Sequence, residues 1–171
     1  MTHRWPLFLL LSTLAGGCAS TGAVPAPFPT PHHDHESAPR PDDEIVAGGT
    51  STDAIVATAL ALRGAPYRDG GGDPSGFDCS GFVVYVFAQH GVLLSRTVAG
   101  QFREGHAVPA DRLQPGDLVF FSTVARGASH VGIAIGGDAF VHAPSERGEV
   151  RVEHLSTPYW STRYVGARRI S

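Results

Sequence analysis

The sequence has no lysine, and arginine provides all 13 of its basic residues. The 16 acidic residues outnumber them, so the formal net charge is −3. From residue 51 onward, 11 basic and 11 acidic side chains cancel. Binding to nucleic acid requires a surface rich in basic charge that can pair with phosphates. The composition therefore argues against nucleic acid as a partner.

The sequence also lacks an apolar run of the roughly 20 residues that a membrane-spanning helix requires. A shorter run, from Trp5 to Leu14, follows Arg4 and leads into small residues at 15–17. A charged start, a short apolar middle and small residues before a cleavage point are typical of a secretory signal peptide. We therefore interpret residues 1–17 as a signal peptide. The alternative, a buried core helix, does not explain the flanking residues.

Cysteine is scarce, because only Cys18 and Cys79 are present. In a secreted chain the two could form one disulfide, or each thiol could have its own chemistry. Cys18 directly follows the small residues, which resembles a bacterial lipobox, although Ala15 stands where leucine is commoner. By this resemblance Cys18 becomes lipidated and anchors the chain to a membrane surface. Ser20 then favours the outer membrane, facing the periplasm, and Cys79 stays a free thiol.

Residues 18–50 form a segment with six prolines and no apolar run. Such a segment buries little apolar surface, so we expect an extended tether between the anchor and a folded domain at 51–171. The tether holds a cluster of three histidines, His32, His33 and His35. They could bind a metal weakly, but a solvated tether explains them as well, and we expect no metal site.

Two helices are predicted in the first part of the domain. Apolar residues at helical spacing indicate a helix over 51–62, and Gly64 and Pro66 end it. A second helix is predicted to begin near Cys79 and to end at Gly91. Its apolar face includes Phe82, Val83, Val86 and Phe87. The stretch 69–76 between the helices has four glycines and one proline, which predicts a loop.

The second part of the domain is predicted to be β structure. Short apolar runs bounded by turn residues indicate five strands, at 117–121, 130–135, 139–142, 150–152 and 164–168. Helices followed by strands are typical of an α+β fold.

Cys79 is predicted to lie at a helix amino terminus, where free N–H groups and partial positive charge lower a thiol pKa. The same N–H groups could stabilise an oxyanion. His130 begins one predicted strand and His142 ends the next, so a hairpin could place them side by side as a base and its orienting group. From spacing alone, Cys79 could equally be a core residue and the histidines could be polar surface residues.

The segment FDCSGFV at 77–83 resembles the nucleophile motif of the NlpC family of bacterial cell-wall cysteine peptidases. Five further segments resemble the same family in the right order over about 120 residues. These are GAPYRDGG at 64–71, LSRTVAGQ at 94–101, LQPGDLVFF at 113–121, SHVGIAIGGDAFVHA at 129–143 and YVGARRI at 164–170. Six ordered motifs are far more specific than any one of them.

The resemblance implies a reduced papain-like fold, with the nucleophile helix packed on an antiparallel sheet. It implies that Cys79 is the nucleophile, His130 the general base and His142 the residue that orients the imidazole. It places Tyr67 near the oxyanion.

The resemblance also bears on residues around the nucleophile. Asp78 and Ser80 flank it and contact substrate or cap the helix, whereas Arg96 and Gln101 are expected to be structural. Asp69 departs from the family pattern, because an aromatic residue is common there, and could alter the cleft wall. A second departure, Ser95 in place of a common proline, is expected to change only a loop.

The resulting hypothesis is a monomeric cysteine endopeptidase that needs no cofactor. It would hydrolyse the bond between D-glutamate and diaminopimelate in peptidoglycan stems. An amidase or acyltransferase on the same scaffold is an alternative, because an acyl-enzyme can pass to acceptors other than water. A non-catalytic wall-binding lipoprotein is another, but a binder has no need of Cys79, His130 and His142 together.

Overall fold

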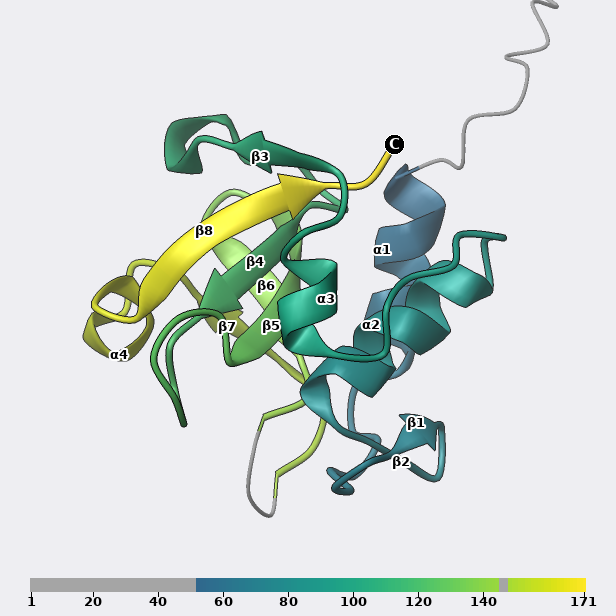
Figure 1. Cartoon of the computed structure of the whole chain (residues 1–171). Helices are drawn as coiled ribbons and strands as arrows, with labels where there is room; N and C mark the ends of the chain where they lie inside the picture. The colour runs from purple at the N-terminus through teal and green to yellow at the C-terminus, as the bar shows by residue number, and fades with distance from the viewer. Residues whose placement is uncertain (1–51, 145–147) are drawn as a thin grey trace, which may run out of the picture. The chain divides into compact units, whose positions relative to one another are not determined.

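A six-stranded antiparallel sheet forms one half of the domain (Figure 1). The computed structural model describes residues 52–144 and 148–171, which belong to one compact unit. The sheet has the order β3-β8-β4-β5-β6-β7. Its strands are β3 (His106–Val108), β4 (Leu118–Phe121), β5 (His130–Gly136), β6 (Ala139–His142), β7 (Arg151–His154) and β8 (Tyr164–Arg169). The proposed signal peptide, Cys18 and the tether lie outside the described residues.

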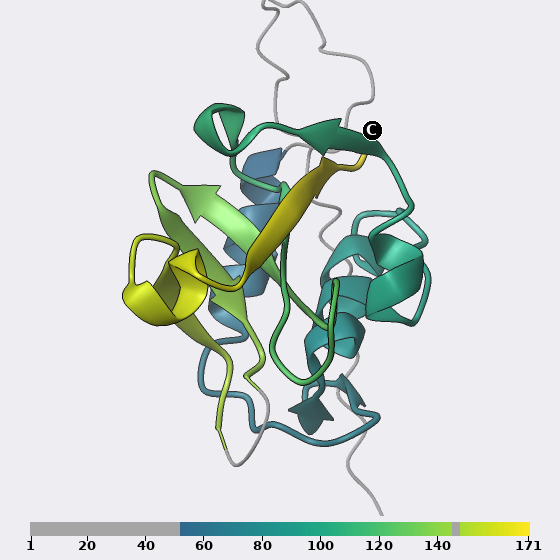
Figure 2. The same cartoon turned by 60° about the vertical axis from the view of Figure 1, so that its left-hand side comes forward.

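The helices are short, and two of them cover one face of the sheet (Figures 1 and 2). They are α1 (Thr52–Ala61), α2 (Cys79–Ala88), α3 (Val98–Gln101) and α4 (Pro158–Ser161), with a 3-10 turn at Ala110–Arg112. The predicted apolar face of α2 is buried against α1 and against alternate residues of β4, β5 and β6. The expected α+β fold, with the cysteine helix packed on an antiparallel sheet, is confirmed. None of the described helices has the length and apolar character needed to cross a membrane.

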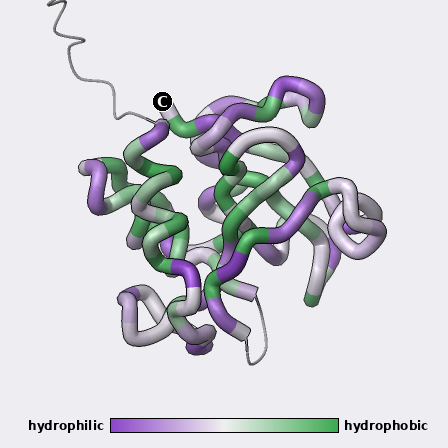
Figure 3. Tube along the Cα trace, turned by 180° about the vertical axis from the view of Figure 1, so that it is seen from behind, coloured by the Kyte–Doolittle hydropathy of each residue, from purple (hydrophilic) through white to green (hydrophobic). Residues whose placement is uncertain are grey.

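The opposite face of the sheet has its own apolar cluster. It contains Val119, Phe121, Ala134 and Phe140 from the sheet, packed with Trp160 of α4. Because side chains alternate along a strand, the register of β4, β5 and β6 puts His130 and His142 on this same face. The hydropathy colouring shows hydrophobic residues gathered in the central strands (Figure 3).

The five predicted strands correspond to β4–β8, with ends that differ by at most two residues. The predicted loop at 69–76 instead contains a small antiparallel hairpin, β1 (Gly72–Asp73) with β2 (Gly76–Phe77). Strand β3 was not predicted either. Strands of two or three residues are too short to show a period of two, so the sequence carries no signal for them.

Candidate active site

The amino terminus of α2 is fixed by Asp78, which directly precedes Cys79. Asp78 has an extended backbone, and its Oδ1 accepts a hydrogen bond from the N–H of Gly81 at 2.7 Å. This is the geometry of an N-cap, so the expected capping role of Asp78 is confirmed. The cap leaves Cys79 as the first residue of the helix, with a free, half-buried thiol.

Gly81 is required by a close backbone approach. A Cβ atom at this position would lie 2.0 Å from the carbonyl oxygen of Gly71 in the preceding loop. Backbone oxygen cannot move away as a flexible side chain can, so a larger residue would displace the loop from the start of α2. The glycine of the nucleophile motif therefore has a steric cause.

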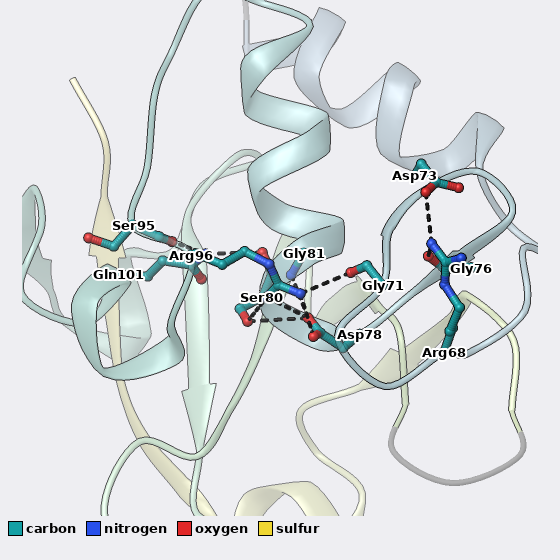
Figure 4. A network of polar contacts seen from close by, with 10 residues as sticks. All are labelled: Arg68, Gly71, Asp73, Gly76, Asp78, Ser80, Gly81, Ser95, Arg96 and Gln101. Carbon is teal, nitrogen blue, oxygen red and sulfur yellow. Dashed lines mark hydrogen bonds and ion pairs between the residues drawn. The ribbon is translucent and has the colours of Figure 1, made fainter.

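A polar network surrounds the start of α2 (Figure 4). Arg96 donates to both oxygens of Asp78, with Nη1–Oδ1 at 2.9 Å and Nη2–Oδ2 at 2.6 Å. It also donates to Ser80 Oγ at 2.9 Å and to the carbonyl of Gly71 at 3.1 Å. Burial alone would raise the pKa of Asp78, but the hydrogen bonds from Arg96 and Gly81 hold that pKa below its usual value. Arg96 thus ties three parts of the chain together, as a structural residue does.

Gln101 is fully buried beneath this network. Its Nε2 donates to the carbonyl of Ser80 at 3.1 Å and to the carbonyl of Ser95 at 2.9 Å. The amide joins α2 to the segment that carries Arg96. Both residues expected to be structural therefore support the residues that flank Cys79.

His130 and His142 form a buried pair on adjacent strands. Nε2 of His130 lies 2.7 Å from Nδ1 of His142, and their exposed fractions are 2% and 0%. The rings are nearly perpendicular, at 86°. The expectation that a hairpin brings these two side chains together is confirmed.

The thiol of Cys79 lies beside the start of β5. The backbone N–H of Val131 interacts with the sulfur, as do the N–H groups of Ser80 and of Cys79 itself. Val131 directly follows His130 in the chain. Cys79 and His130 therefore lie at the same end of the sheet, one contributed by α2 and the other by β5.

Tyr67 lies beside Phe77, the residue that precedes the cap residue Asp78. It forms an isolated parallel bridge with Phe77, and its N–H donates to the carbonyl of Gly148 at 2.7 Å. The side chain is half-buried and packs against the main apolar cluster. Asp69, two residues on, is exposed.

Trp160 and Glu153 contact the histidine pair and were not predicted from the sequence. The indole stacks on His130 with ring centroids 5.5 Å apart and meets His142 edge-on at 5.0 Å. Its N–H donates to the Glu153 carboxylate, which also accepts from Nε of Arg151 at 2.6 Å. Nε2 of His142 also lies near this carboxylate, 3.7 Å from Oε1 of Glu153. That nitrogen is buried and has no hydrogen-bond partner among the described residues.

A comparison with known protein families agrees with the fold and with the geometry of the site. The sequence profile of the NlpC/P60 family matches residues 64–169. The chain belongs to this family. That range includes every residue that forms the site described above.

Three similar proteins illustrate the NlpC/P60 relationship. The probable peptidoglycan endopeptidase LytE of Bacillus subtilis is 41% identical over 115 residues, 67% of this chain and 33% of that protein. Murein DD-endopeptidase MepH of Escherichia coli is 43% identical over 140 residues, 72% of this chain and 52% of that protein. A crystal structure of an NlpC/P60 family protein from Bacillus cereus has a TM-score of 0.65 at 37% identity, covering 70% of this chain and 40% of that one. The chain spans a third of the length of LytE and about half of the length of MepH.

The electrostatics of this NlpC/P60 site differ from expectation in one respect. Burial, assisted by the Asp78 carboxylate, raises the pKa of the Cys79 thiol to about 11. The N–H groups at the helix terminus lower that pKa, as expected, but burial has the larger effect. The expected net lowering is therefore wrong in direction. Burial also lowers the pKa of His130 to about 4, so the resting pair at neutral pH is a thiol and a neutral imidazole.

Residues 52–144 and 148–171 contain no group of three or more His, Cys, Asp or Glu side chains arranged to hold a metal ion. The three tether histidines lie outside these ranges.

The buried histidines of the NlpC/P60 domain should make its stability fall in acid. Burial lowers the pKa of His142 to about 2, so between pH 7 and 5 the unfolded chain binds a proton that the folded chain does not. The free energy of unfolding then decreases by about 2 kcal/mol over this interval for each such histidine. Urea unfolding of His142→Gln at pH 7 and pH 5 should show a smaller decrease than in the parent.

His106→Gln is the matched control, because His106 is exposed on β3. It should show the same acid-induced decrease as the parent protein. An unchanged decrease in His142→Gln would contradict the account of a neutral buried pair.

Proposed function

We propose that this protein is a cysteine endopeptidase that hydrolyses the peptide stems of peptidoglycan. The observation that carries the proposal is the free thiol of Cys79 at the capped end of α2, beside a strand whose first residue belongs to a buried histidine pair. The names of LytE and MepH support the substrate, since both refer to cell-wall endopeptidases. A non-catalytic wall binder would not need this arrangement.

In the first half of the reaction, the sulfur of Cys79 attacks the scissile carbonyl carbon while its proton passes to Nδ1 of His130. The proton transfer must accompany the attack, because the resting thiol and imidazole are both neutral. The carbon–nitrogen bond then breaks, and the imidazolium returns the proton to the leaving amine. The product is a thioester on Cys79.

In the second half, His130 takes a proton from a water molecule that attacks the thioester. The carbon–sulfur bond breaks, and the proton returns to Cys79, so the enzyme is regenerated. His142 holds the imidazole by accepting a hydrogen bond at Nδ1 from Nε2–H of His130. This tautomer places the proton of His142 on Nε2, toward Glu153.

The oxyanion would be stabilised by the N–H of Cys79 and by the hydroxyl of Tyr67. The N–H already faces the sulfur, and free N–H groups at a helix start stabilise negative charge. The N–H of Gly81 is not available, because it donates to the cap. The acyl part of the stem would lie against the network of Asp78, Ser80 and Arg96.

The bond attacked is proposed to be that between D-glutamate and diaminopimelate. A second candidate is the D,D bond of cross-linked stems, which the name of MepH favours. Exposed Asp69 adds negative charge near Arg96 at the acyl side, where the family commonly has an aromatic ring.

Digestion of purified peptidoglycan tests the proposal and distinguishes the two bonds. Mass spectrometry should find stems cut after D-glutamate. Conversion of cross-linked dimers to intact monomers would instead assign the D,D bond. Transfer of the acyl group to an added amine without hydrolysis would favour the acyltransferase alternative. Unchanged peptidoglycan, with folded protein shown by circular dichroism, would contradict all of these enzyme functions.

We further propose that residues 1–17 are removed, that Cys18 is lipidated and that a tether at 18–50 carries the peptidase domain at 51–171 from the outer membrane. The support is the sequence pattern alone. Cys18→Ala should move the protein from the membrane fraction to the soluble fraction of the cell envelope. Unchanged membrane association would contradict a lipid anchor at Cys18.

A further inference from the structure

A polar cavity of about 240 Å³ borders the histidine pair. Its walls include His130, Arg151, Glu153, Tyr159 and Trp160. These residues come from the start of β5, from β7 and from α4. Figures 1 and 2 both show α4 and the start of α2 on opposite sides of the sheet. The cavity therefore lies on the far side of His130 from the network around Asp78.

If the proposed function holds, the position of this cavity suits it to bind the leaving-group side of the substrate. His130 returns its proton to the leaving amine, so the residue that bears this amine must lie next to His130. The acyl part of the stem lies toward α2 and the Asp78 network. The cavity on the other side is then the place for the residue that carries the leaving amine.

Arg151 is a wall residue of the cavity and has hydrogen-bond donors that no described residue uses. Its Nε donates to Glu153, and no acceptor among the described residues binds its two terminal nitrogens. The carboxylate of Glu153 is itself held by the indole N–H of Trp160. Glu153 therefore fixes the orientation of the guanidinium, while 49% of the Arg151 side chain remains exposed to solvent. A planar guanidinium edge matches the two oxygens of a carboxylate.

We propose that Arg151 binds a free carboxylate on the residue that carries the leaving amine. In peptidoglycan stems this residue is diaminopimelate or lysine, and only diaminopimelate has a carboxylate at the end of its side chain. Arg151 then makes the enzyme selective for diaminopimelate stems. The inference holds for both candidate bonds, because diaminopimelate provides the leaving amine in each.

Two synthetic stem peptides that differ only in diaminopimelate or lysine test this role. The parent protein should have a higher kcat/KM for the diaminopimelate peptide by about tenfold or more, which is typical of one charge-assisted hydrogen bond. In Arg151→Gln this ratio should fall toward one. Arg68→Gln is the matched control, because Arg68 is 51% exposed and pairs with Asp73 at 2.7 Å outside the cavity. It should keep the parent ratio.

The outcomes separate this inference from the proposed function. Cleavage of both peptides with equal efficiency by the parent would overturn the inference and leave the peptidase function intact. An equal loss on both peptides in Arg151→Gln would also overturn it, because Arg151 would then act through Glu153 and His142. Failure of the parent to cut either peptide or peptidoglycan would contradict the proposed function itself.

Discussion

Cys79→Ser is expected to reduce kcat/KM for stem peptides by about a thousandfold or more. A serine hydroxyl is a far weaker acid than a thiol, and neutral, buried His130 is too weak a base to deprotonate it. The fold should be preserved, because the cap of α2 is made by Asp78 and the N–H of Gly81 and does not involve the sulfur. Cleavage rates and the thermal midpoint, measured on the same preparation, separate these two effects.

Cys18→Ser is the natural control for this variant, since it removes the only other cysteine of the chain. With soluble peptide substrates it should keep the parent rate. Residual cleavage above about a tenth of the parent rate in a folded Cys79→Ser protein would show that the sulfur is not the nucleophile.

His130→Ala is expected to lower kcat by about a thousandfold, within the range for loss of a general base. His142→Ala should cost less, about tenfold to a hundredfold, because the base remains and only its orientation is lost. The 2.7 Å contact between Nε2 of His130 and Nδ1 of His142 is the basis of this order. Steady-state kinetics on one stem peptide gives both values.

His154→Ala controls for the loss of a histidine from the same sheet. His154 is exposed at the end of β7 and forms a hydrogen bond with Asp138, away from His130 and His142. It should keep the parent kcat. A larger loss in His142→Ala than in His130→Ala, with both proteins folded, would reverse the assignment of base and orienting residue.

The sequence predicts the parts of the site that depend on local pattern. The spacing of Phe82, Val83, Val86 and Phe87 defines the buried face of α2 and so places Cys79 at its start. The five short apolar runs bounded by turn residues likewise predict β4–β8. The pairing of His130 with His142 followed from their places at the ends of a hairpin.

The remaining features depend on tertiary packing, which the sequence pattern does not express. Trp160 reaches the histidines only because α4 folds back over the sheet, although Pro158 at the first position could have indicated a short helix. Arg151 and Glu153 alternate along one strand, which could have placed them on one face. Their proximity to His142 comes from the β6–β7 register. The raised pKa of Cys79 reflects burial, which outweighs the local effect of the helix terminus.

The central claim is that the sulfur of Cys79 forms the bond to substrate. The most direct test is partial alkylation with iodoacetamide, in which peptide mapping gives the fraction of Cys79 modified and the same samples are assayed on a stem peptide. If the sulfur is the nucleophile, activity decreases linearly with this fraction and reaches zero when Cys79 is fully alkylated, whatever the state of Cys18. Substantial cleavage by protein with fully alkylated Cys79 would contradict this claim.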